Sequence, residues 1–236
     1  MDDTNLAAKV GELRARGLTP KQIAKTLGVR RADVEPLIRA HAQATSSAVE
    51  PAVVGCWVSP RWSHGLTWTG HHEWHDIDFA DDPMPGLISV LVAREHRYGK
   101  VSACGFLVDA QCLGVKNAVP PMVIDRLELG VLVQRYFGNY DEPPVSAPIE
   151  LAQHVVLGAL EYARRLGFDP HPDFEVCRGH LGTWSGSSAI EFGFHGKPLF
   201  VRGPHDDAQK VIRTLEQSVG PGQFELGPRL LRLENL

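Results

Sequence analysis

Residues 19–34 read TPKQIAKTLGVRRADV, and their spacing is typical of two helices joined by a tight turn. Thr19 is a preferred residue for the start of a helix, and Gln22 stands where its side chain can complete a capping box. Gly28 tolerates the left-handed backbone that such a turn needs. The small side chain of Ala24 lets the two helices approach each other closely. The stretch therefore predicts a helix, a turn and a second helix.

Helical spacing on both sides of this stretch extends the prediction to three helices. An upstream pattern begins at Asn5 and ends before Gly17, and the downstream helix continues to about Ala42. The apolar positions that would close a small core are Ile23, Leu27, Val29, Val34 and Leu37. We expect residues 1–42 to form an independent all-α module with three helices.

The offsets of Ala24, Gly28 and three apolar positions resemble those of the helix-turn-helix DNA-binding family over residues 4–42. The resemblance implies that the module contacts DNA, with its last helix in a groove. The residues placed for contact are Arg30, Arg31 and Arg39 at base edges, with Lys21, Gln22 and Lys25 at phosphates.

Charge supports DNA contact by this module, although with two reservations. Residues 1–45 carry eight Lys and Arg against five Asp and Glu, so the net charge is +3 there and −7 on the remainder, giving −4 overall. Asp33 and Glu35 place negative charge where a phosphate would approach. Pro36 is tolerated only in the first turn of a helix, which predicts a late start for the third helix.

A module of this charge is expected to bind DNA as a homodimer. The alternative is a three-helix module used for dimerisation or protein contact.

Composition indicates an ordinary globular protein, with 43% hydrophobic and 22% charged residues. The four cysteines form no CxxC pair and no dense framework, so neither a zinc ribbon nor a disulfide scaffold is indicated. No stretch is apolar enough to cross a membrane or to act as a leader, and we expect a cytoplasmic protein with no membrane partner. The cysteines are Cys56, Cys104, Cys112 and Cys177.

The chain after the module is predicted to be a linker and then one α+β domain with β-hairpins and packed helices. Polar and small residues without periodicity place the linker at 43–51, and the domain at 52–236. We expect the clearest helix, 149–166, to pack on a sheet that contains the first hairpin. The expected elements are a hairpin of 87–94 with 101–108, helices at 122–137, 149–166 and 206–219, and a hairpin of 189–194 with 199–202.

A stretch rich in His and Trp, residues 60–85, is the first candidate for chemistry in this domain. His71 and His75 are four residues apart, and Asp76 or Asp78 could add an oxygen ligand to a metal. Glycine and proline in the stretch argue against a helix that would bring both imidazoles to one side. The alternative, which we favour, is a surface loop whose histidines are solvated.

The second candidate is the turn after the second strand of the first hairpin. Asp109 could bind a metal and Lys116 could stabilise an anionic transition state, as in metal-dependent phosphodiester hydrolysis. Against this, polar residues at strand ends are usually turn formers. Cys112 could act as a nucleophile with a histidine as base, but a buried thiol is the simpler interpretation. No cofactor is predicted.

Parts of the domain, residues 87–118 and 158–204, also resemble an uncharacterised family of bacterial proteins of unassigned function. The segments that carry this resemblance are Phe106–Asp109, Cys112–Lys116, Phe168–Asp173 and Gly196–Pro198. The resemblance implies no activity. The leading hypothesis is a DNA-binding regulatory or architectural protein whose α+β domain dimerises or senses a partner. The alternatives are a metal-dependent hydrolase or nuclease targeted to DNA, and a protein-interaction adaptor.

Overall fold

The computed structural model describes residues 3–15, 18–46, 50–76, 86–184 and 186–227. The chain divides between Pro51 and Ala52 into two compact units, each of which is described by itself. No helix in these ranges is both long enough and apolar enough to cross a membrane.

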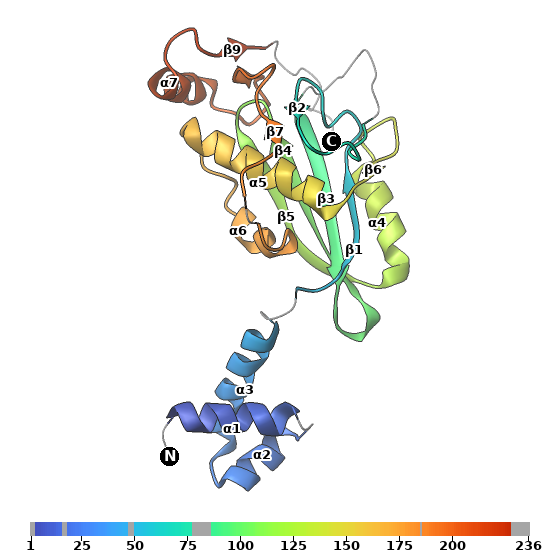
Figure 1. The fold of residues 1–236 in the computed structure, drawn as a ribbon, viewed down its shortest axis with the longest axis vertical. Coiled ribbons are helices and arrows are strands. Elements are labelled where there is room, and N and C mark those ends of the chain that lie inside the picture. Colours follow the sequence, from blue (N-terminus) through green and yellow to red (C-terminus); the bar gives the residue numbers. More distant parts are fainter. Residues whose placement is uncertain (1–2, 16–17, 47–49, 77–85, 185, 228–236) are drawn as a thin grey trace. The chain divides into compact units, whose positions relative to one another are not determined.

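The N-terminal unit consists of three packed helices, as the sequence predicts (Figure 1). The backbone N–H of Gln22 donates to Thr19 Oγ1 over 3.4 Å, and the N–H of Thr19 donates to Gln22 Oε1 over 2.8 Å, which completes the capping box. Gly28 ends the second helix with φ of 66°. The helices are α1 (Asp3–Ala15), α2 (Pro20–Leu27) and α3 (Arg31–Ser46), and their buried core is Val10, Ile23, Ala24 and Val34.

Two expectations about α3 are wrong. The helix begins at Arg31, immediately after the turn, and Pro36 lies inside it. The helix also continues to Ser46, so the first residues of the predicted 43–51 linker are helical. The apolar periodicity of the sequence is weak after Ala42, and this concealed the extension.

The C-terminal unit is built on a five-stranded antiparallel sheet (Figure 1). The predicted first hairpin is confirmed, since Leu87 to Glu95 pair in continuous register with Asp109 to Val101. The edge strand β5 contains Pro120 and Pro121, where its register against β4 shifts by one residue. In spatial order the strands are β5 (Gly114–Ile124), β4 (Val101–Asp109), β3 (Leu87–Glu95), β1 (Val53–Val58) and β6 (Val145–Ser146).

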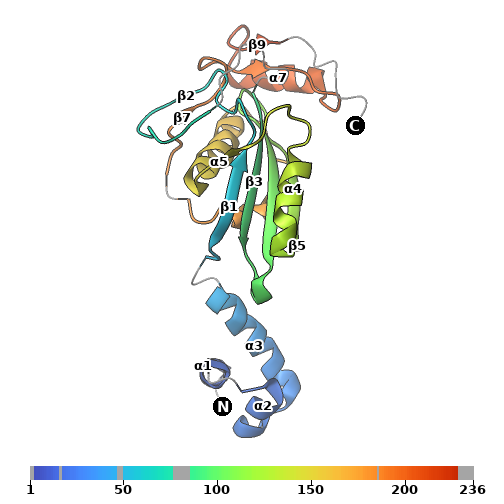
Figure 2. The same ribbon diagram turned by 90° about the vertical axis from the view of Figure 1, so that its right-hand side faces the viewer.

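Helices cover both faces of this sheet (Figure 2). The predicted helix α5 (Ile149–Arg165) is confirmed and packs with α6 (Phe174–Cys177) against side chains such as Val92. The next residue of that strand, Ala93, belongs to the cluster under α4 (Leu129–Tyr136) on the opposite face. Successive residues of a strand therefore pack into two hydrophobic cores, one on each face of the sheet. This explains why β3 and β4 are apolar at nearly every position.

The helix predicted for 122–137 is wrong before Leu129. Residues 122–124 pair with Val101 to Ala103 in β4, and a short 3₁₀ turn at Arg126–Glu128 precedes α4. Cross-strand pairing decides the conformation there, although the local apolar pattern is compatible with a helix.

The second predicted hairpin is also wrong, because its two arms pair elsewhere. Residues near 190 and 200 approach each other only at the isolated bridge between Phe194 and Lys197. The expected last helix, by contrast, is confirmed as α7 (Ala208–Ser218). The two small sheets are β2 (Thr67–Trp68) with β7 (Ile190–Glu191), antiparallel, and β8 (Leu199–Phe200) with β9 (Glu225–Leu226), parallel.

The contact between α5 and the sheet can be tested at Ala159, which is fully buried. An Asp at this position would place a carboxylate in the apolar layer, and we expect Ala159→Asp to destabilise the unit by more than about 3 kcal/mol. Urea unfolding followed by circular dichroism measures the loss. Arg164→Asp, at an exposed position of the same helix, is the control. Equal stability of the two variants would contradict the described packing.

Candidate functional site

The side chains predicted to contact DNA come from α2 and the start of α3. Lys21, Gln22 and Lys25 are exposed on α2, Arg30 lies in the turn, and Arg31 is the first residue of α3. Arg39 also belongs to α3, but its side chain lies outside the described part of the chain. All six predicted residues therefore belong to α2, the turn or α3.

Several of these side chains already have partners within the module. Gln22 is part of the capping box. The guanidinium of Arg30 makes two hydrogen bonds to Asp33, of 3.0 and 2.9 Å, and these bonds lower the pKa of the Asp33 carboxyl. Arg31 Nε donates to Glu35 Oε1 over 2.7 Å. The negative charges noted in the sequence therefore neutralise the two arginines, whereas Lys21 and Lys25 remain exposed.

The histidine-rich loop places its residues in structural roles. His71 stacks on Trp74 with ring centroids 4.0 Å apart, and its Nδ1 lies 2.9 Å from Glu73 Oε1. Asp76 accepts hydrogen bonds from the backbone N–H of Arg61 and of Ser63, so its carboxylate orders the preceding turn. His75 is exposed and its carbonyl accepts the indole N–H of Trp62, over 3.0 Å.

The fourth predicted metal ligand, Asp78, lies outside the described residues. Among the residues that the structure does describe, no group of three or more His, Cys, Asp or Glu side chains is arranged to hold a metal ion.

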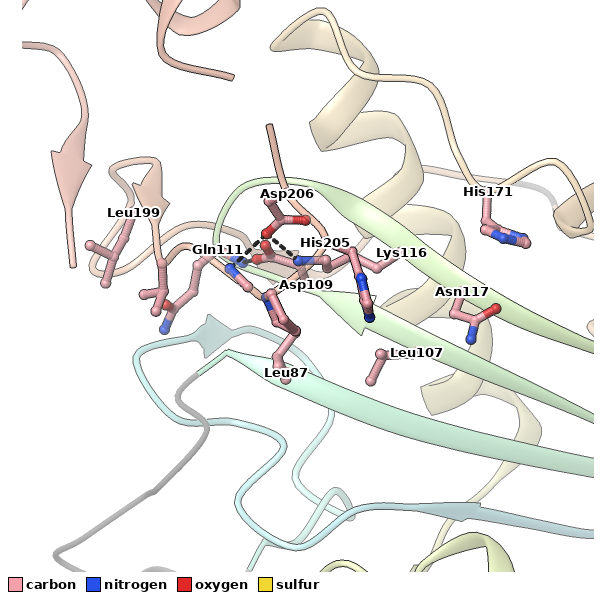
Figure 3. A pocket seen from close by; sticks show the side chains of 13 residues that line it. Leu87, Leu107, Asp109, Gln111, Lys116, Asn117, His171, Leu199, His205 and Asp206 are labelled. Atoms are coloured by element: carbon pink, nitrogen blue, oxygen red, sulfur yellow. Dashed lines mark hydrogen bonds and ion pairs between the residues drawn. The ribbon is translucent and has the colours of Figure 1, made fainter. Parts of the chain in front are cut away.

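Asp109 and Lys116 both line a cavity of about 480 Å³ at the end of the β4–β5 hairpin (Figure 3). Residues from the chain after β8 form another wall of it, although they are about ninety positions away in the sequence. This volume is in the range of small-molecule sites. Its lining is Leu87, Leu107, Asp109, Gln111, Lys116, Asn117, His171, Leu199, Val201, Gly203, Pro204, His205 and Asp206.

The Asp109 carboxyl is almost completely buried and closes the turn after β4. Its Oδ1 accepts the backbone N–H groups of Gln111 and Cys112 over 3.0 and 2.9 Å. Burial raises the pKa of Asp109 to about 6, although the charge of Lys116 and the backbone donors act in the opposite direction. Asp109 therefore forms the turn, as the simpler interpretation of the sequence predicts. Its carboxyl also borders the cavity.

Lys116 is directed by a β-bulge in β5. Val115 pairs with Val108 and Asn117 pairs with Leu107, so Lys116 is the extra residue of the strand. Its Nζ donates to Asp206 Oδ2 over 2.7 Å, in an ion pair that is mostly shielded from solvent.

Asp206 is a residue of this site that the sequence did not single out, because it stands at the predicted start of the last helix, where a carboxylate is an ordinary cap. The cap is Asp207, which accepts the N–H of Lys210. Asp206 instead accepts the N–H of Gly203 over 2.8 Å in addition to the lysine (Figure 3). The sequence did hold one signal, the two adjacent acids Asp206 and Asp207. The start of a helix needs only one carboxylate as its cap, so the other is available for a different role.

The proposed nucleophile Cys112 is a buried thiol. It packs with Leu166, Phe200 and Leu215 in a hydrophobic cluster, and burial raises its pKa. A thiol in this environment stays protonated at neutral pH and is a poor nucleophile. The structure therefore supports the simpler interpretation of Cys112.

Comparison with protein-family models, with curated proteins and with solved structures finds no match for this chain.

The buried carboxyl of Asp109 predicts a specific pH dependence of stability. Because its pKa in the folded protein, about 6, is above the ordinary 3.8, the folded chain keeps the proton to higher pH than the unfolded chain. The free energy of unfolding therefore falls as pH rises between these values. Asp109→Asn keeps an acceptor for the turn and removes the titration, so its stability relative to the wild type should rise by about 2 kcal/mol from pH 4 to pH 7.

Urea unfolding at a series of pH values measures this difference. Asp169→Asn, at an exposed position, controls for the loss of one carboxylate. A difference between Asp109→Asn and the wild type that does not change with pH would show that Asp109 titrates normally.

Proposed function

We propose that this chain binds duplex DNA through α2 and α3, as a regulatory or architectural protein. The supporting observation is the corner between the two helices. Gly28 closes α2 in the left-handed conformation, three residues separate α2 from α3, and Ala24 and Val34 are buried between them. A corner of this kind can seat its second helix in the major groove while the first crosses the phosphate backbone.

The internal ion pairs of this surface are compatible with DNA contact. The side chain of Arg30 is 85% exposed and that of Arg31 is 66% exposed, so both pairs lie in solvent. Exposed ion pairs contribute at most about 1 kcal/mol. A phosphate or a guanine edge can therefore take the place of Asp33 or Glu35 at little cost, since a bidentate arginine contact to guanine discriminates by about 1–3 kcal/mol.

Substitutions on this surface should affect DNA binding in two distinct ways. Lys21→Ala should weaken binding to all sequences and reduce the slope of log affinity against log salt by about one, because one phosphate contact is lost. The Arg30→Ala/Arg31→Ala double variant should lose affinity mainly on the preferred sequence. Asp33→Asn should tighten binding, because it frees Arg30 and removes a negative charge. Fluorescence anisotropy across a salt series measures all three.

Arg97→Ala is the matched control, since it removes an exposed positive charge from the turn between β3 and β4. Equal binding by wild type and the double arginine variant, on every DNA and at every salt concentration, would leave the module as a helix-turn-helix fold without a DNA function. The protein-interaction adaptor would then be the better hypothesis.

We further propose that the DNA-binding form is a homodimer, because the net charge of one module is modest. The exposed apolar side chains of Met122 and Val131 line one groove, together with Glu128 and Arg135 among others. Contiguous exposed apolar side chains are typical of interaction surfaces. A second copy fits this groove by charge, because a two-fold axis can pair Glu128 of each copy with Arg135 of the other.

Val131→Glu should therefore convert a dimer to a monomer and lower the affinity for DNA at the same time. Analytical ultracentrifugation gives the oligomeric state, and anisotropy gives the affinity. Val176→Glu is the control, because Val176 is similarly exposed on α6. A monomeric wild type, or a Val131→Glu variant that remains dimeric, would contradict this surface.

A further inference from the structure

The amide of Gln111 is a buried polar group without a partner. The residue is 1% exposed, and neither Nε2 nor Oε1 makes a hydrogen bond within the described part of the chain. The amide packs on Gly86, where a Cβ atom would lie 2.4 Å from Gln111 Cδ. Its side chain lines the cavity that Asp109 and Lys116 also border.

This lack of partners is confined to the side chain. The backbone N–H of Gln111 donates to Asp109, and its carbonyl accepts the N–H of Leu199 over 3.1 Å. Each unsatisfied buried donor or acceptor costs stability, so native proteins seldom retain both on one amide without a reason. A buried glutamine beside a cavity, with both amide atoms unpaired, therefore points to recognition of a ligand.

The other walls of the cavity show what kind of ligand would fit. Leu87, Leu107, Leu199 and Val201 give an apolar lining suited to the faces of a flat ring. Leu199 and Gln111 lie at one end of the cavity, the Lys116 ion pair lies near its middle, and Asn117 and His171 lie at the other end (Figure 3). The cavity therefore combines apolar side chains with hydrogen-bonding groups along its length, at a volume of about 480 Å³.

We propose that this cavity binds a nucleobase as part of a nucleoside-sized ligand, with the amide of Gln111 reading the edge of the base. A primary amide presents one donor and one acceptor side by side, and nucleobases present the complementary pair on one edge. Both amide atoms are buried, so binding includes a rotation about the last side-chain bond, which is a soft torsion in glutamine. The leucine side chains of the lining offer the base an apolar contact. This proposal does not rest on DNA binding by the N-terminal unit.

Isothermal titration with adenosine, guanosine, cytidine and uridine tests the proposal on the full chain. At least one nucleoside should bind the wild type, and Gln111→Leu should weaken that binding at least tenfold while leaving the melting temperature equal or higher. The rise is expected because leucine removes an unsatisfied buried amide. The purine and pyrimidine arms show which base edge is read.

Gln153→Leu is the matched control. The Gln153 amide donates to the carbonyls of Leu181 and Thr183, so this variant should lower the melting temperature and bind nucleosides as the wild type does. Failure of all four nucleosides to bind the wild type, or equal binding by Gln111→Leu, would overturn the proposal.

If Gln111→Leu does not fold, the wild type alone decides the matter. The backbone N–H signal of Leu199 in a nitrogen-15 spectrum should shift on addition of the bound nucleoside, and an unchanged signal would overturn the proposal. DNA affinity measured on the same variants should be unchanged, so that failure of this site and failure of the DNA surface remain distinguishable.

Discussion

The arrangement of the C-terminal unit depends on the closed turn that the buried carboxyl of Asp109 holds. Asp109 Oδ1 accepts the backbone N–H groups of Gln111 and Cys112, while both backbone groups of Ala110 and the carbonyl of Gln111 bond to other segments. Ala110 donates to Gly86 and accepts from Gly193, and Gln111 accepts from Leu199. One turn thereby joins the start of β3 and two segments of the C-terminal third, and it does so with main-chain groups that any sequence possesses.

Neighbouring side chains of this turn point in different directions, so one can stabilise the core while the next lines the cavity. Cys112 enters the hydrophobic cluster with α7, while Gln111 lines the cavity. The bulge that follows directs Lys116 to Asp206. A functional group on so rigid a turn keeps its geometry at a low cost in conformational entropy, because the backbone is already ordered. The cavity therefore lies beside a part of the backbone that hydrogen bonds already hold in place.

Local signals in the sequence predicted local structure well, and distant partners were beyond their reach. Two of these predictions depend only on residues that are close together in the sequence. They are the capping box of Thr19 with Gln22 and the helix predicted for 149–166, and both are present in the structure. The pairing of Lys116 with Asp206 depends on how the chain returns across ninety positions, which no periodicity records. For the same reason β7 and β8, whose partners are distant strands, were assigned to one false hairpin. Asp109 was found from its place at a strand end, whereas the unpaired state of Gln111 exists only in the folded environment.

The two prolines of the edge strand also have a consequence for how this protein meets other chains. An edge strand normally exposes a row of N–H and C=O groups that can be extended by any strand in solution. Pro120 and Pro121 have no N–H, and the shift in register beside them bends the ladder. Strand addition along this edge would be interrupted in its middle, which protects a long, apolar antiparallel sheet from growing into an aggregate. Another chain can therefore associate with this edge through side-chain contacts, which depend on its sequence. It cannot do so by continuous backbone pairing, which any strand could make.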